Sequence, residues 1–172
     1  AQIMLNRPKN SLRLALFYCF LLAALGLFAF LTRTMQPPDV SIKTITNKTI
    51  NLSALRGRVV LITFWASNCG NCLKEIVHFK SLYNDYHQAG LEIIAIAMQY
   101  DRPDHVIAAS KSLQIPYDIA LDLTNKLAVA FGDVRLIPTT ILINPNGDIV
   151  YNTTGIFDLA NMQTRIESLI TQ

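Results

Sequence analysis

A seven-residue apolar segment that leads into a pair of cysteines constrains this chain more than any other feature. Residues 59–65 (VVLITFW) are mostly β-branched, aliphatic or aromatic, which is typical of a strand buried on both faces. Cys69 and Cys72 follow, and a helical spacing of apolar residues continues to about residue 87. The expected buried stripe comprises Leu73, Ile76, Val77, Leu82, Tyr83 and Tyr86. The sequence therefore predicts a cysteine pair between a buried strand and a helix.

The rest of residues 39–172 alternates between strand and helix patterns. Gly90 ends the first helix, and Asn146-Gly147 marks a turn in which glycine supplies a positive φ. Apolar spacing predicts a hairpin over 40–52, further strands at 91–98, 117–121, 139–143 and 148–153, and helices at 101–113, 124–131 and 158–170. This order predicts an α/β fold with a mixed central sheet flanked by helices.

A second apolar run lies near the start of the chain. Residues 14–31 carry no charge, and Gly26 is the one residue of the run outside the apolar class. As a helix the run would extend ~27 Å, close to the ~30 Å hydrocarbon core of a bilayer. A cleaved signal peptide would end on small residues, whereas residues 28–31 are FAFL. A buried core helix is disfavoured because the run is apolar on all sides. We therefore expect an uncleaved membrane anchor.

The distribution of charge gives this segment an orientation. Residues 1–38 hold four basic residues and no acidic one, whereas residues 39–172 hold 11 basic and 12 acidic residues. Three of the four basic residues precede the run, and the positive flank of an anchor stays in the cytoplasm. The expected organisation is a cytoplasmic tail (1–13), a transmembrane anchor (14–32), a linker (33–38) and a folded domain (39–172) outside the cytoplasm. This nearly neutral domain lacks the basic surplus that binds nucleic acid, so nucleic acid is excluded as a partner.

The position of the two cysteines determines which chemistry they favour. Main-chain N–H groups at the start of a helix stabilise a nearby anion, so a thiolate at Cys69 is favoured. Cys72 lies one turn further on, near enough to close a ring with Cys69 and expected to be more buried. This asymmetry makes Cys69 the attacking thiol and Cys72 the resolving thiol in thiol–disulfide exchange.

Other uses of the pair stay open at this point. A structural disulfide across one turn closes too small a loop to stabilise much. Zinc normally needs four ligands, but Cys19 lies in the apolar run and the three histidines show no paired spacing, so no metal site is predicted. Two thiolates suit copper(I), which keeps a copper(I) metallochaperone as an alternative. A peroxiredoxin-like peroxidase is another, although Asn68 directly precedes Cys69 where that class places its cysteine in a threonine-containing loop.

Several motifs together resemble one family, and the resemblance covers roughly residues 39–172. The motifs are Thr63-Phe64-Trp65-Ala66-Ser67, the C-x-x-C pair, Glu75, Ile137-Pro138-Thr139-Thr140 and Asn146-Gly147. In the order and spacing of these motifs, the chain resembles a membrane-anchored thioredoxin-fold protein of the TlpA/ResA type. The resemblance implies a thioredoxin-like fold with an N-terminal β-hairpin extension, and thiol–disulfide oxidoreductase activity that needs no cofactor.

The resemblance also implies roles for individual residues. The Ile137–Pro138 bond is expected to be cis and to lie beside the cysteines, with the main chain of Ile137 free to pair with an extended substrate. Trp65 is expected to form the wall of this substrate-binding site. Glu75 is expected to be partly buried, to tune the thiols and to carry the proton that Cys72 loses.

The implied partners are proteins on both sides of an electron transfer. The resemblance favours a reductase that takes electrons from a membrane thiol donor of the DsbD/CcdA type and reduces protein disulfides, such as those of apocytochrome c. Its location would be the bacterial inner membrane, with the domain in the periplasm. The oxidase or isomerase direction stays open. Asn68 and Asn71 depart from the aromatic residue and the proline common at these positions, which bears on redox potential and substrate fit.

Overall fold

The computed structural model describes residues 9–31 and 36–171. The chain divides into two compact units, Ala1–Thr34 and Met35–Gln172. Residues 1–8 of the expected tail and residues 32–35, at the junction of the expected anchor and linker, lie outside the described residues.

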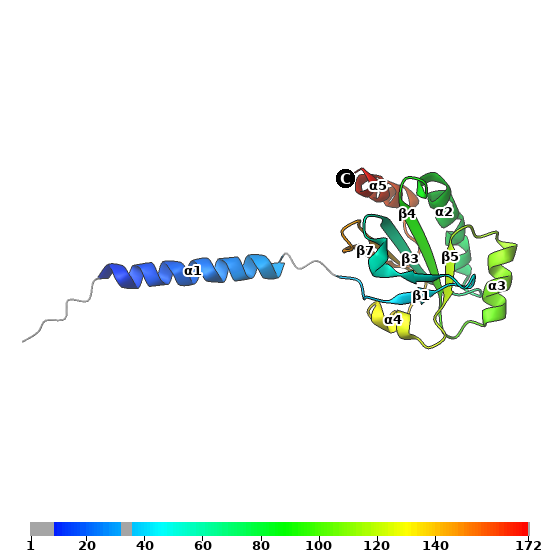
Figure 1. Ribbon diagram of the computed structural model, residues 1–172, viewed down its shortest axis with the longest axis horizontal. Helices are drawn as coiled ribbons and strands as arrows, with labels where there is room; N and C mark the ends of the chain where they lie inside the picture. The colour runs from blue at the N-terminus through cyan, green and yellow to red at the C-terminus, as the bar shows by residue number, and fades with distance from the viewer. Residues whose placement is uncertain (1–8, 32–35, 172) are drawn as a thin grey trace, which may run out of the picture. The chain divides into compact units, whose positions relative to one another are not determined.

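The first unit contains one long helix, α1 (Lys9–Leu31; Figure 1). The run without charge falls inside this helix. The side chains described along it, residues 14–26, are all exposed, including large apolar ones such as Phe17 and Phe20. Within the residues that the structure describes, no helix is both long and apolar enough to cross a membrane.

The second unit is built on a five-stranded mixed sheet with the strand order β5–β4–β3–β6–β7. These strands are β3 (Val59–Trp65), β4 (Leu91–Ala97), β5 (Asp118–Leu121), β6 (Thr139–Ile143) and β7 (Ile149–Thr154). Strand β4 runs parallel to β3 and β5, whereas β6 runs antiparallel to β3 and β7. A separate hairpin of β1 (Ser41–Lys43) and β2 (Thr49–Asn51) precedes them. The expected hairpin and mixed sheet are confirmed.

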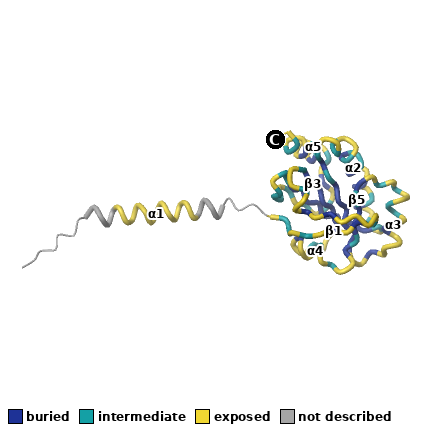
Figure 2. Tube along the Cα trace, viewed as in Figure 1, coloured by how far each residue is buried: buried dark blue, intermediate teal, exposed yellow. Residues whose placement is uncertain are grey.

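Helices cover both faces of the sheet (Figure 1). They are a 3₁₀ turn η1 (Leu52–Leu55) and the α-helices α2 (Gly70–Tyr86), α3 (Pro103–Ser112), α4 (Lys126–Ala130) and α5 (Leu159–Ile170). Because side chains alternate along a strand, β3 contributes to two cores. Leu61 packs with residues of α2, α3 and α5, whereas Ile62 packs with the β1–β2 hairpin and α4. Every residue of β3 is buried, as predicted, and Figure 2 shows this interior.

Two details differ from expectation. Val77 is 67% exposed and was wrongly placed in the buried stripe of α2, which instead includes Phe79 at 2%. Helix α4 begins at Lys126 because the preceding Asn125 adopts a left-handed conformation, with φ of 59°. The buried carboxylate of Asp122 accepts the N–H groups of Leu127 and Ala128 and so holds this short helix in place.

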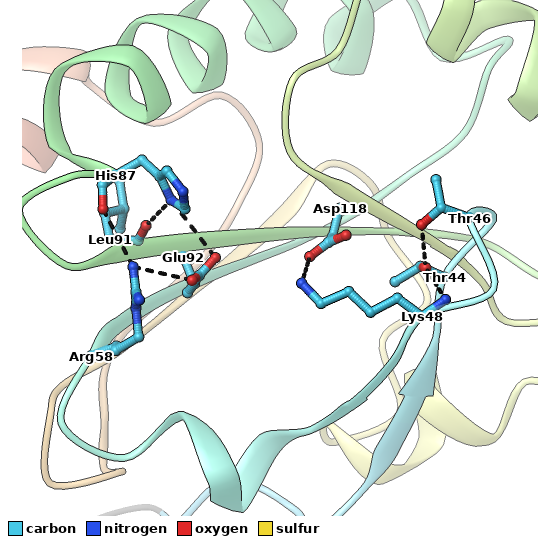
Figure 3. Close-up of polar contacts among 8 residues, drawn as sticks. All are labelled: Thr44, Thr46, Lys48, Arg58, His87, Leu91, Glu92 and Asp118. Carbon is cyan, nitrogen blue, oxygen red and sulfur yellow. Dashed lines mark hydrogen bonds and ion pairs between the residues drawn. The ribbon is translucent and has the colours of Figure 1, made fainter.

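Charged side chains pair near the beginning of β3 and β4, away from the cysteines that follow the end of β3. Arg58 lies 3.1 Å from Glu92, and the ring of His87 lies 3.8 Å from the same carboxylate. Figure 3 shows both directed at Glu92, with Lys48 paired separately to Asp118 at 2.7 Å. Such partly exposed pairs contribute roughly 0–1 kcal/mol each. They support the fold without entering the site.

Candidate active site

The site is built where β3 ends and α2 begins. Cys69 is the N-cap of α2, in an extended conformation, and its Sγ accepts the main-chain N–H of Cys72 at 3.1 Å. The two sulfur atoms form a disulfide, with an S–S distance of 2.11 Å. Cys72 is 2% exposed, whereas Cys69 is partly exposed. Cys69 is therefore the more accessible cysteine of the pair.

The start of α2 also sets the electrostatics of the pair. Cys69 stands at the positive end of the helix, and none of the residues in the first turn of α2 is acidic. In the disulfide, the main-chain N–H of Cys72 donates to Cys69 Sγ. After reduction the same N–H can donate to the Cys69 thiolate. This arrangement favours Cys69 as the nucleophile and as the leaving group.

Glu75 lies one turn after Cys72 on α2 and has no exposed surface. Its Oε1 accepts the N–H of Phe157 at 3.1 Å, while its buried Oε2 has no hydrogen-bond partner among the described residues. Burial raises the pKa of Glu75 from 4.5 to about 7, and the bond from Phe157 opposes this rise only in part. The carboxyl group therefore exchanges its proton near neutral pH.

Tyr117 is a second buried titratable residue in the core that holds Cys72. It is 6% exposed, and its ring lies 6.1 Å from that of Phe79. Burial raises the pKa of the Tyr117 phenol, and the negative charge of Glu75 adds to the rise. Tyr117 therefore stays protonated at neutral pH, and Glu75 is the group of the two that titrates.

The proline loop lies at the same end of the sheet as the cysteine motif. The Ile137–Pro138 bond is cis, as predicted. Phe64 pairs with Thr139 in the antiparallel ladder of β3 and β6, so Pro138 is level with Trp65, just before the cysteine motif. Pro138 is buried and accepts the N–H of Gly155 at 2.8 Å. Topology therefore brings the proline and cysteine motifs together, although they are far apart in sequence.

Ile137 and Trp65 lie at this end of the sheet and differ in how far they are buried. Ile137 is half-buried, packs against the same core as Cys69, and has no main-chain hydrogen bond to another described residue. Trp65 is 2% exposed and lies in that core with Cys72. The main chain of Ile137 is therefore unpaired among the described residues, whereas Trp65 packs inside the core beneath the site.

Two contacts were missed by the sequence analysis. One is the bond from the main chain of Phe157 to Glu75, for which the sequence carries no signal. The other is a double hydrogen bond from Ser67 to the carboxylate of Asp101. The sequence did carry a signal for this second contact. Asp101 follows β4 closely, and the carboxyl ends of the parallel strands β3 and β4 lie at the same end of the sheet.

The described residues include no group of three or more histidine, cysteine, aspartate or glutamate side chains arranged to hold a metal ion. The chemistry that the arrangement itself offers is exchange between the Cys69–Cys72 disulfide and thiols or disulfides of other molecules.

The sheet, the redox-active cysteine pair at the start of α2 and the cis-proline loop define the class: this is a thiol–disulfide oxidoreductase with a thioredoxin-like fold. The chain belongs to the Redoxin family, which it matches over residues 33–166.

Named relatives agree with this class. The chain is 32% identical over 121 residues to the thiol-disulfide oxidoreductase ResA of Halalkalibacterium halodurans, an alignment that covers 70% of this chain and 67% of the relative. It is 32% identical over 118 residues to the thiol-disulfide oxidoreductase ResA of Bacillus subtilis. This alignment covers 69% of this chain and 65% of that relative. The crystal structure of a thioredoxin-family thiol:disulfide interchange protein from Chlorobium tepidum superposes with a TM-score of 0.74 at 22% identity, over 81% of this chain and 98% of that one, and supports the fold.

Proposed function

We propose that this protein reduces disulfides of other proteins on the outer side of the bacterial inner membrane, to which its N-terminal helix anchors it. The observation that carries the proposal is the Cys69–Cys72 disulfide at the N-terminus of α2, with Cys69 more accessible than Cys72. Exchange through such a pair needs no bound cofactor.

In the reductive cycle, the thiolate of Cys69 attacks one sulfur of a substrate disulfide. An intermolecular disulfide forms, and one substrate thiolate leaves and takes up a proton. The thiolate of Cys72 then attacks Cys69 Sγ, which closes the internal disulfide and releases the second substrate thiol. The substrate gains two electrons and two protons, and the protein is left oxidised. A membrane thiol donor of the DsbD/CcdA type would return it to the dithiol by the reverse exchange.

Glu75 serves this cycle as the proton acceptor for Cys72. Cys72 is too buried to lose its proton directly to solvent. Glu75 lies one turn further along α2 and is bonded to Phe157, which belongs to the core that holds Cys72. A carboxyl group with a pKa of about 7 is half ionised at neutral pH, which suits a group that accepts and returns a proton in each cycle.

Substrate recognition is proposed to occur at the proline loop. The unpaired main chain of Ile137 would add an extended substrate segment as an extra strand, and Pro138 offers no N–H that would compete for it. Such binding reads backbone more than side chains, so it suits substrates that are unfolded near their disulfide. Apocytochrome c is the substrate class that we propose.

The direction of electron flow is tested by a redox titration of the full chain in detergent against glutathione and dithiothreitol. We expect a reversible two-electron couple with a midpoint near that of thioredoxin, about −270 mV. A midpoint near that of an oxidase, about −120 mV, would contradict the reductase direction. No reversible couple, with copper(I) retained by the purified protein, would indicate the metallochaperone. Rapid peroxide turnover that survives Cys72→Ser would indicate a peroxidase.

The anchor is tested by fractionation of cells that express the full chain. Residues 14–31 form an uncharged run, and the side chains described within it are exposed and largely apolar. We expect the protein in the membrane fraction after an alkaline wash, with its domain cleaved by protease added to spheroplasts. A variant lacking residues 14–31 should be soluble. Recovery of the intact full chain in the soluble fraction would overturn the anchor.

A further inference from the structure

The carboxylate of Asp101 is bound to the loop that carries Cys69. Its Oδ2 accepts the main-chain N–H of Ser67 at 2.5 Å, and its Oδ1 accepts the Ser67 hydroxyl at 2.7 Å. Asp101 is 9% exposed, and no basic side chain among the described residues pairs with it. A buried carboxylate of this kind depends on its hydrogen bonds, and Ser67 supplies two of them.

Ser67 lies in the turn that delivers Cys69 to α2. The turn is closed by a hydrogen bond from the N–H of Cys69 to the carbonyl of Ala66 at 3.1 Å. Just before it, the N–H of Met98 donates to the carbonyl of Trp65 at 3.0 Å, which joins the ends of β3 and β4. The bond between Ser67 and Asp101 adds a side-chain clamp to these main-chain bonds, and it ties the turn to the loop between β4 and α3.

We propose that Asp101, acting through Ser67, is a positioning residue for Cys69 in thiol–disulfide exchange. The inference rests on the exchange function proposed above. Each cycle breaks and re-forms the bond between Cys69 and Cys72, so Cys69 Sγ must return to within reach of Cys72 Sγ every time. Hydrogen bonds to a charged acceptor are about twice as strong as neutral ones, so the clamp restricts the turn. A restricted turn raises the effective concentration of one thiol toward the other.

The equilibrium with glutathione measures this effective concentration directly. One protein dithiol and one glutathione disulfide give one protein disulfide and two molecules of reduced glutathione, so electrons and protons balance. The measurement uses the full chain in detergent with Cys19→Ser, which leaves the Cys69–Cys72 pair as its only cysteines.

The position of Ser67 is tested without any change of charge. Ser67→Ala loses the hydroxyl bond but keeps the N–H bond, and we expect it to lower the equilibrium constant by roughly threefold. Ser67→Thr keeps a hydroxyl and should restore the constant of the parent protein. If Ser67→Ala and Ser67→Thr share the parent constant, the positioning role is contradicted.

The charge is tested by a matched pair of aspartates. Asp101→Asn weakens both bonds. It also removes a negative charge from the loop bound to the turn before Cys69, and this removal stabilises the Cys69 thiolate. Both effects disfavour the disulfide, so the constant should fall at least as far as in Ser67→Ala. Asp104→Asn removes the same charge from an exposed carboxylate paired to Arg102, and should leave the constant unchanged.

Each outcome separates one explanation from another. A lowered unfolding midpoint in Ser67→Ala and Asp101→Asn, with the parent equilibrium constant retained, would show that the clamp only stabilises the fold. If Asp101→Asn does not fold, the two Ser67 variants decide alone. A parent protein without a reversible couple would instead contradict the proposed function.

Discussion

Cys72→Ser is expected to convert the protein into a trap for its own substrates. Cys69 would still attack a substrate disulfide, because it is the accessible sulfur at the N-terminus of α2. The mixed disulfide would then persist, since no thiol at position 72 resolves it. Turnover should fall by roughly a thousandfold. Covalent adducts that disappear on reduction should accumulate and be visible by non-reducing electrophoresis.

Two controls make this result specific. All variants should carry Cys19→Ser, so that adducts on the third cysteine are excluded. Cys69→Ser should lose turnover to the same extent but form no adducts, because it lacks the attacking sulfur. Full activity in Cys69→Ser, or adducts formed equally by both single variants, would show that the roles of the two cysteines are wrongly assigned.

Glu75→Gln is expected to change how stability depends on pH. The folded pKa of about 7 lies above the ordinary value of 4.5. Below pH 4.5 the carboxyl is protonated in both states, and as pH rises toward 7 the unfolded chain releases the proton while the folded chain retains it. Stability is therefore lost across this window, by about 2 kcal/mol after allowance for screening. Chemical unfolding from pH 4 to 8 should show this loss in the parent protein and a flatter profile in Glu75→Gln.

The same substitution tests the proton role. Glutamine keeps an oxygen to accept the N–H of Phe157 but cannot accept the proton of Cys72. The rate at which Cys72 resolves a mixed disulfide should therefore lose its inflection near pH 7 and fall by about tenfold. Glu167→Gln, an exposed change on α5 that keeps an oxygen to accept the Tyr86 hydroxyl, is the matched control and should leave both profiles unaltered. An unchanged exchange profile in Glu75→Gln would remove Glu75 from the mechanism.

Much of the fold follows from local patterns. Residues 59–65 and 139–143 were predicted as strands and are β3 and β6 with the same bounds. Both are continuous apolar or β-branched runs, for which burial on two faces leaves little ambiguity. The wrong placement of Val77 shows the limit of this reasoning: an apolar residue at the border of a helical stripe can face either side, and packing decides.

The sequence predicted the motifs of the site but not the distant residues that contact them. The cysteine pair and the proline loop are each contained in a short stretch of sequence. Their position at the same end of the sheet follows once β3 and β6 pair. The partners that adjust the site come from far along the chain. Phe157 lies 82 residues from Glu75, and Asp101 lies 34 residues from Ser67. No local pattern records the contact between Phe157 and Glu75, and the contact between Ser67 and Asp101 follows only from the parallel pairing of β3 and β4.

By itself, the sequence determined the order of the strands and helices along the chain and favoured thiol–disulfide exchange as the chemistry of the cysteine pair. Hydrophobic periodicity and helix capping depend on neighbouring residues, so they can be read without coordinates. Only the tertiary structure decided that Glu75 is fully buried and that Asp101 clamps the turn before Cys69. Both depend on the exclusion of water and the meeting of distant segments, which arise only when α2, α5 and the ends of β3 and β4 pack together.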